Sequence, residues 1–216
     1  MTRHFLDIAD IDSAALQQIL ARAQEMKVTL QQGDMPSLLQ GKHLAMIFEK
    51  ASTRTRVSFE VGINQLGGHA IVIDAATSQL GRGETVADTA QVLSRYADII
   101  MLRTFSHDTL LEMAEHASVP VINGLTDRSH PCQVMADILT FTEHRGDIAG
   151  KKVAWVGDFN NMTVSWIEAA EKLGFTLNIA CPEALHRSDF ALPEAVTLYT
   201  DPAEAVSGAD LVTTDT

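Results

Sequence analysis

The stretch HLAMIFEKASTRTRVSFEVG, residues 43–62, decides the fold class of this chain. It opens with an apolar run typical of a buried strand and closes with an amphipathic pattern typical of a helix. Three hydroxyl residues and two arginines crowd into positions 52–56, where the strand gives way to the helix. A strand followed so closely by a helix indicates a βα unit, from which parallel sheets are built.

The same alternation of strand and helix continues along the whole chain. Strands are predicted at 43–48, 69–74, 98–103, 119–124, 151–157, 176–182, 196–200 and 209–216. Helices are predicted at 12–33, from about 55 onward, and at 84–96, 107–117, 129–146, 161–174 and 202–208. This pattern predicts the α/β class, with right-handed crossovers and two domains that each contain a parallel sheet flanked by helices. The polar run EHRGDIAGKK predicts the joint, with domains at 1–146 and 147–216.

Composition and charge narrow the class of partner. The chain has 216 residues and a formal net charge of −12, and nucleic acids are bound by net-basic faces, so they are poor candidates. No apolar run is long enough to span a bilayer, and the acidic N-terminus does not resemble an export signal. The two cysteines, Cys132 and Cys181, fit neither a disulfide framework nor a zinc pattern. These features favour a reducing cytoplasm and no metal.

The residues at 52–56 suit a small anion. In open α/β sheets, ligands bind beyond the carboxyl ends of the strands, where helix N-termini offer free N–H groups and a positive dipole end. Hydroxyl groups can donate hydrogen bonds to phosphate oxygens, and an arginine can hold two of these oxygens at once. The chain has no GxxxxGK[ST] pattern, which argues against a nucleoside triphosphate loop. Taken alone, such a stretch is more often a capped helix start with solvated arginines than a ligand site.

Polar residues recur at other predicted strand ends. Arg103 closes one strand, His130 and Gln133 open the helix that follows another, and Asn160 and Asn161 follow the first strand of the second domain. Each has an ordinary alternative as a surface charge, a helix cap or a turn former. Together they predict one polar rim, because the carboxyl ends of parallel strands share an edge.

These motifs resemble those of the aspartate/ornithine carbamoyltransferase family. S-T-R-T-R after a strand, R-T-F at a later strand end and H-P-C-Q opening a helix follow the family's order and spacing along the whole chain. H-P-C-Q in place of H-P-T-Q, together with G-D-x-N-N, points to the ornithine branch. The resemblance implies transfer of the carbamoyl group from carbamoyl phosphate to the δ-amine of L-ornithine. The products would be L-citrulline and phosphate, and no metal or organic cofactor would be required.

The resemblance also implies the site residues. Those that would bind carbamoyl phosphate are Ser52, Thr53, Arg54, Thr55, Gln79, Arg103, His130 and Gln133. Among them, Arg103, His130 and Thr55 would be the catalytic donors to the carbonyl oxygen as it gains charge. Gln79 matches a residue that the family supplies from the neighbouring subunit, which implies a homotrimer with shared sites. Asn161 and Asp215 match the family's ligands for ornithine.

Two departures from the family's pattern are visible. Phe159 stands in G-D-F-N-N where the family commonly has glycine, and a bulky side chain there could alter the loop that presents Asn161. Family members also continue beyond D-T into a W-x-S-M-G loop, an H-C-L-P segment and closing helices. We therefore expect a fragment with an incomplete second domain and with little or no transferase activity by itself.

Other functions remain open at this stage. The acceptor could be aspartate, putrescine or an acylated ornithine, because acceptor choice lies largely in the second domain. The chain could also bind carbamoyl phosphate or form trimers without catalysis. The resemblance implies a role in arginine biosynthesis, and the sequence leaves a degradative role open. Cys132 as a nucleophile is disfavoured, because residues two apart on a helix do not face each other and His130 could not activate it.

Overall fold

The computed structural model describes residues 2–186 and 190–215. Its contacts divide the chain into two compact units, each described separately below. The first unit contains the residues up to Leu6 together with Gln24–Asp127. The second contains Asp7–Ala23 and the residues from Arg128 onward. Helix α1 (Ser13–Gln31) therefore contributes its first part to the second unit and its last part to the first.

The first unit is built on a parallel sheet with strand order β2-β1-β3-β4. The strands are β1 (His43–Phe48), β2 (His69–Asp74), β3 (Ile99–Arg103) and β4 (Val121–Leu125). Phe48 pairs with Asp74 on one side and with Arg103 on the other. This register brings the last residues of three strands level at the carboxyl edge of the sheet, the edge at which α/β proteins bind ligands.

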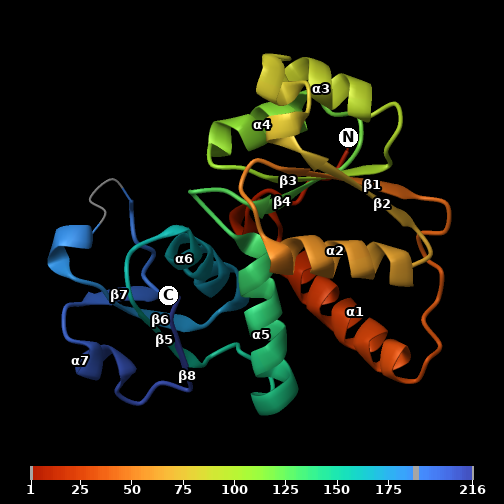
Figure 1. Cartoon of the computed structure of the whole chain (residues 1–216). Helices are drawn as coiled ribbons and strands as arrows, with labels where there is room; N and C mark the ends of the chain where they lie inside the picture. The colour runs from red at the N-terminus through yellow and green to blue at the C-terminus, as the bar shows by residue number, and fades with distance from the viewer. Residues whose placement is uncertain (1, 187–189, 216) are drawn as a thin grey trace. The chain divides into compact units, whose positions relative to one another are not determined.

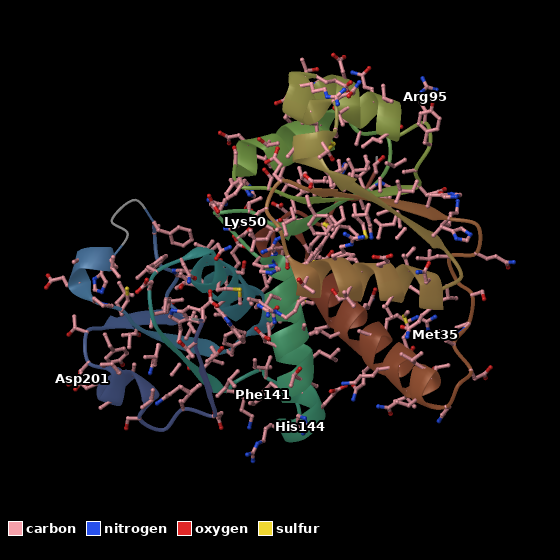
Figure 2. The ribbon with its side chains drawn as sticks, viewed as in Figure 1. Met35, Lys50, Arg95, Phe141, His144 and Asp201 are labelled. Carbon is pink, nitrogen blue, oxygen red and sulfur yellow. The ribbon has the colours of Figure 1, made fainter. Side chains whose placement is uncertain are left out.

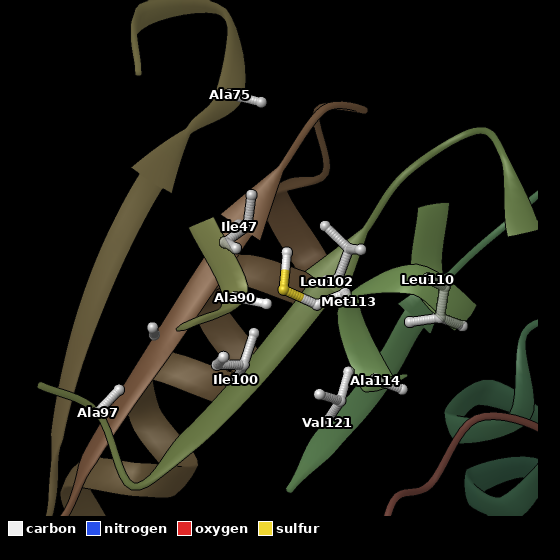
Figure 3. Close-up of a cluster of buried hydrophobic side chains, with 11 residues drawn as sticks. Ile47, Ala75, Ala90, Ala97, Ile100, Leu102, Leu110, Met113, Ala114 and Val121 are labelled. Carbon is white, nitrogen blue, oxygen red and sulfur yellow. The ribbon is translucent and has the colours of Figure 1, made fainter. Parts of the chain in front are cut away.

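Helices cover both faces of this sheet (Figure 1). They are α2 (Thr53–Gln65), α3 (Val86–Leu93) and α4 (His107–His116), with short 3-10 turns η2 (Ala75–Thr77) and η3 (Leu80–Arg82) after β2. Helices α3 and α4 pack on one face through a buried cluster that includes Ile47, Ile100 and Met113 (Figure 3). Helix α2 packs on the other face through Ile63 and Phe59, so its N-terminus is fixed over the strand ends.

The second unit repeats this architecture with the strand order β7-β6-β5-β8, again fully parallel. The strands are β5 (Lys152–Val156), β6 (Thr176–Ala180), β7 (Val196–Tyr199) and β8 (Leu211–Thr213). The helices are α5 (Pro131–Arg145), α6 (Asn161–Leu173) and α7 (Pro202–Val206), with 3-10 turns η1 (Ile8–Asp10) and η4 (Glu183–Leu185). Helix α6 is buried along most of its length, which makes it the central helix of this unit.

The predicted fold class and the two parallel sheets are confirmed, and most predicted boundaries lie within two residues of those observed. Helix α2 begins at Thr53 rather than near Thr55, because the Ser52 hydroxyl caps it. The predicted domain boundary at 146 and 147 stays a prediction, and we note that contacts place α5 with the second unit. In the part of the chain that the structure describes, no helix combines the length and apolar character needed to cross a membrane.

Candidate anion site at the start of helix α2

The first turn of helix α2 carries the polar residues that the sequence singled out. Ser52 adopts an extended backbone conformation as the N-cap, and its Oγ accepts a hydrogen bond from the Thr55 N–H at 3.3 Å. The Ser52 hydroxyl in turn donates to Thr55 Oγ1 at 3.1 Å. The remaining N–H groups of the first turn have no partner within the helix and point toward any ligand at its end.

Arg103, the last residue of β3, reaches the same helix start. Its side chain is only 9% exposed, and Nη1 donates to Thr55 Oγ1 at 3.1 Å. The Nε atom is buried and makes no hydrogen bond to any residue that the structure describes. A buried donor without a partner is costly, so its presence here marks a place prepared for an additional acceptor.

A second arginine adds positive charge to this helix start. Burial of the guanidinium lowers the pKa of Arg103, and the nearby charge of Arg54 lowers it further. Within residues 2–186 and 190–215, neither guanidinium is paired with a carboxylate, whereas Arg56 has Glu60 at 3.5 Å. Two neighbouring cations that lack a counter-ion produce a local excess of positive charge on a chain of net charge −12. Such a spot attracts a small anion.

Polar contacts tie together the loops around this edge of the sheet. The buried Thr104 hydroxyl donates to Glu49 Oε2, which links the ends of β3 and β1. Lys50 lies 3.4 Å from Asp127 Oδ1, and its ammonium group sits 5.2 Å from the centre of the Phe105 ring. Figure 2 marks Lys50 at this edge. The loops after β1, β3 and β4 are therefore held in one arrangement.

A pocket of about 320 Å³ opens beside the helix start on the side of β2. Its polar lining comes from Ser52, Thr53 and Arg56, together with the acidic residues Glu49 and Asp74. The cavity has room for a small polar ligand, and its walls carry both signs of charge.

His130 and Gln133 lie at the start of α5, in the second unit. His130 occupies the N-cap position, and its backbone N–H donates to Ser165 Oγ at 2.9 Å. Gln133 is exposed and donates from Nε2 to Asp137 Oδ1 at 2.9 Å. Cys132 lies between them, and burial raises its pKa to about 12, so it stays a neutral thiol at ordinary pH. That protonation state does not suit a nucleophile.

The G-D-F-N-N loop follows β5 and leads into α6. Asn160 is the N-cap of this helix and takes part in a reciprocal capping box with Thr163. Its Nδ2 also donates to Asp215 Oδ2 at 3.4 Å, so the structure joins Asp215 to this loop. Our sequence reasoning selected Asn161, the first residue of the helix, and missed the capping and bridging role of Asn160. An asparagine just before an apolar helical pattern is the signal that could have indicated it.

Phe159 and Gln79 occupy well-defined places. Phe159 is buried, and its ring centre lies 5.9 Å from that of Phe190. Its bulk is therefore directed into the unit rather than over the loop. Gln79 is exposed in the turn before η3, where it helps to line a mostly apolar pocket of about 210 Å³. No described interaction connects it to the α2 start of the same chain.

The structure thus brings together Ser52, Thr55, Arg54 and Arg103 in the first unit, and Asn160 and Asp215 in the second. In the described ranges, no group of three or more His, Cys, Asp or Glu side chains is arranged to hold a metal ion.

Comparison with known families matches almost the entire chain. Residues 3–143 match the carbamoyl-P binding domain of aspartate/ornithine carbamoyltransferases, and residues 149–216 match the Asp/Orn binding domain of the same family. The gap between the two matches falls in the polar run around residues 143–152, where the sequence predicts a joint.

Individual relatives and solved structures agree with this match. A protein named ornithine carbamoyltransferase from Nitrobacter winogradskyi is 56% identical over 99% of this chain and 72% of its own length. One from Pelobacter propionicus is 54% identical over 100% of this chain and 73% of its own length. The crystal structure of ornithine carbamoyltransferase from Burkholderia thailandensis superposes with a TM-score of 0.94 at 49% identity, covering 99% of this chain and 75% of that one. The enzyme from Pyrococcus furiosus gives a TM-score of 0.93 at 44% identity, covering 99% and 72%.

Proposed function

This chain belongs to the aspartate/ornithine carbamoyltransferase family, and from that premise we propose how its residues serve transfer of a carbamoyl group to ornithine. The relatives that share more than half of its residues carry the name ornithine carbamoyltransferase. In this reaction the free δ-amine of L-ornithine attacks the carbamoyl carbon of carbamoyl phosphate. The bond from that carbon to the phosphate oxygen breaks, the amine loses a proton, and L-citrulline and phosphate are released.

The observation that carries the proposal is a pair of arginines, Arg54 in the first turn of α2 and Arg103 at the end of β3, neither of which pairs with a carboxylate among the residues that the structure describes. Carbamoyl phosphate brings a dianionic phosphate, which is the ligand that Arg54, Arg103 and the free N–H groups of the helix lack. Ser52, Thr53 and Thr55 supply hydroxyl donors to the same oxygens. As the phosphate departs it gains charge, and these donors stabilise it without needing to reorganise.

The carbamoyl carbonyl oxygen needs donors of its own, because it becomes an oxyanion in the tetrahedral transition state. Arg103 is suited to this role, since its free Nε and its contact with Thr55 Oγ1 place donors next to the phosphate cradle. By resemblance, His130 joins Arg103 and Thr55 as a catalytic donor, and Gln133 binds the carbamoyl group. Loss of one donor of this kind typically costs about 10²–10³ in rate.

The second unit supplies the proposed ligands for ornithine. Asn161 and Asp215 are assigned by resemblance, and the hydrogen bond from Asn160 to Asp215 supports them because it holds this carboxylate beside the first turn of α6. A carboxylate such as Asp215 is suited to a cationic amino group of the acceptor.

Three further features belong to the proposal. We propose that the chain acts in the cytoplasm, because its two cysteines form no disulfide framework, and that it serves arginine biosynthesis, as the resemblance implies. We also propose a homotrimer in which Gln79 reaches the carbamoyl phosphate of the neighbouring subunit. The exposure of Gln79 in the turn before η3 supports that role, because an exposed side chain is available to a neighbouring subunit.

The test begins with calorimetric titration of the purified chain with carbamoyl phosphate, with inorganic phosphate as the comparison ligand. We expect saturable binding that is tighter for carbamoyl phosphate, because its carbamoyl group adds contacts that phosphate lacks. Citrulline formation with ornithine is then compared with carbamoyl-aspartate formation with aspartate. Equal affinity for the two anions by a folded chain would contradict the site assignment, and a preference for aspartate would contradict the acceptor.

A further inference from the structure

The second unit also contains a polar cluster built around two buried carboxylates, whose members have no assigned role in the reaction. It joins the N-terminal segment around η1, the residues just before α5, and the middle of α6. We define this Asp7 cluster as Asp7, Arg128, Ser129 and Glu168. Asp7 and Glu168 are each only 6% exposed, and Ser129 is fully buried. Buried carboxylates are uncommon unless they are paired, so the contacts of this cluster require an explanation.

Arg128 and Ser129 are held by the two buried carboxylates. The Ser129 hydroxyl donates to Asp7 Oδ1, and Arg128 Nε lies 3.4 Å from Asp7 Oδ2. Arg128 Nη2 also lies 3.9 Å from Glu168 Oε1. On its other side, Glu168 Oε2 accepts a hydrogen bond from the backbone N–H of Ala9 at 3.3 Å. Glu168 therefore bridges the N-terminal segment and Arg128.

The next residue along the chain, His130, is hydrogen bonded to α6, the helix that carries Glu168. Its backbone N–H donates to Ser165 Oγ at 2.9 Å, and Ser165 precedes Glu168 by about one turn of α6. Three consecutive residues are thus fastened by side-chain contacts, two to buried carboxylates and one to a buried hydroxyl. This fixes the backbone from which the imidazole of His130 projects.

We infer that Asp7 and Glu168 are positioning residues for His130 and act through Arg128 and Ser129. The inference rests on the proposed role of His130 in binding the carbamoyl group. None of the four cluster members needs to touch the substrate. They hold the start of α5, where a displacement of about 1 Å can cost on the order of 10²-fold in rate.

The charge state of Glu168 makes this positioning sensitive to pH. Burial raises the pKa of Glu168 to about 7, and the negative charge of Asp7 is the next cause. Asp10 raises this pKa further, whereas the Ala9 N–H and Arg128 oppose the rise. Above neutral pH, Arg128 is held by two carboxylates. Protonation of Glu168 removes one of the two carboxylate charges that hold Arg128, so the hold on Arg128 and on His130 weakens as the pH falls through about 7.

Magnetic resonance of the His130 imidazole tests this inference directly in the full chain. The ring signals are assigned by their loss in His130→Asn and followed over about one unit of pH on either side of the pKa of Glu168. Because an imidazole also responds to its own protonation, the effect of Glu168 is the difference between the wild type and Glu168→Gln: we expect an additional step near pH 7 in the wild type that is absent from Glu168→Gln. Glu171→Gln is the matched control, because Glu171 is exposed on the same helix and its replacement should leave the additional step in place.

A second measurement keeps the test independent of how Glu168→Gln folds. Arg128 is partly exposed, so its replacement leaves the core intact. We expect Arg128→Gln to weaken carbamoyl phosphate binding about tenfold, and Arg128→Lys, which keeps the charge, to restore much of the loss. If the ring signals of His130 follow the same pH profile in Glu168→Gln as in the wild type, or if Arg128→Gln binds carbamoyl phosphate unchanged, the positioning role is overturned. If His130→Asn itself binds normally, the proposed role of His130 fails instead, and the imidazole titration still decides whether Glu168 positions it.

Discussion

At the scale of single residues, Arg103 is the side chain of the anion site that combines burial, positive charge and a donor available to a ligand. It is buried, hydrogen bonded to Thr55, and left with an unpaired Nε beside the charge of Arg54. A guanidinium can keep its contact with Thr55 and still donate to a ligand, because its five N–H donors are spread over a rigid plane. A lysine ammonium group at the same position cannot do both in the same geometry.

We therefore predict that Arg103→Lys loses most carbamoyl phosphate binding although the positive charge is retained. The expected loss is about 10- to 100-fold, the range for one hydrogen bond to a charged group. Calorimetry with carbamoyl phosphate measures it, and Arg95→Lys, a solvent-exposed arginine of the same unit, is the matched control. Equal affinity in Arg103→Lys and the wild type would show that charge alone binds the ligand.

Glu168 permits a prediction about stability. Its pKa is 4.5 in the unfolded reference and about 7 in the folded chain, so the folded state retains a proton that the unfolded state releases. The stabilisation from this proton is complete below about pH 4.5 and is lost as the pH rises through about 7. Above that pH, ionised Glu168 costs on the order of 3 kcal/mol. Glu168→Gln removes this cost.

We predict that the free energy of unfolding, measured with urea, falls between about pH 5.5 and about pH 8.5 by on the order of 2 kcal/mol more in the wild type than in Glu168→Gln. Glu171→Gln should follow the wild type, because its side chain is exposed. A parallel pH dependence in wild type and Glu168→Gln would mean that Glu168 is ionised over the whole range. Glu168→Gln is thus expected to be more stable than the wild type at alkaline pH but to position His130 less well. Functional sites often show this opposition between stability and activity.

The sequence revealed these residues unevenly. Arg103 could be predicted as a site residue because it ends an apolar run of strand length, and such a run can be recognised from neighbouring residues alone. The Asp7 cluster could not be found, because Asp7 and Glu168 are separated by most of the chain and each reads as an ordinary surface acid. Only tertiary packing shows that they share one arginine. Likewise, the contact between Asn160 and Asp215 depends on how β8 pairs with β5.

At the scale of elements, the start of α2 combines a structural and a binding function. Ser52 ends the extended segment after β1 and accepts the N–H of Thr55, which satisfies one of the free donors of the helix. Its hydroxyl also orients Thr55, whose oxygen accepts from Arg103. The cap therefore fixes both the helix and the side chains that surround the anion.

We predict that Ser52→Ala lowers the free energy of unfolding by about 1 kcal/mol in the absence of ligand, the usual value of an N-cap. Ser58→Ala is the control, because Ser58 lies in the same helix but donates only to a backbone carbonyl one turn earlier. Urea denaturation of both variants measures the difference. An equal effect of the two substitutions would show that the Ser52 hydroxyl is not a significant cap.

Elements were the level that sequence predicted best. Both β1 and β2 begin and end at the predicted residues, because each is a compact apolar run bounded by polar residues. Strand β8 is shorter than the predicted 209–216, since only Leu211–Thr213 pair with β5 among the residues described. Strand order was beyond reach, because the periodicity of a strand carries no information on which neighbour it pairs with.

At the scale of the whole molecule, the sequence predicted both the family and the fold, because the family's motifs and the alternation of strands and helices extend along its entire length. The domain boundary at 146 and 147 stays a prediction, and by its contacts α5 groups with the second unit. The roles of the site residues rest on resemblance and on local geometry, so variants must test them. The proposed homotrimer can be tested through Gln79, because this residue is exposed and is assigned to the site of the neighbouring subunit.

We predict that two inactive variants, Gln79→Ala and Arg103→Ala, restore activity when their subunits are mixed. If each site takes Arg103 from one subunit and Gln79 from its neighbour, every mixed trimer contains one site with both residues intact. An equal mixture after reversible dissociation should then reach about a quarter of the wild-type rate of citrulline formation, as expected for random assembly in a cyclic trimer. The control is Ser52→Ala mixed with Arg103→Ala, whose lesions lie on the same side of every site and cannot complement in this way. If the Gln79→Ala mixture stays as inactive as its parents, although mass measurement shows mixed trimers, Gln79 acts within its own subunit or not at all.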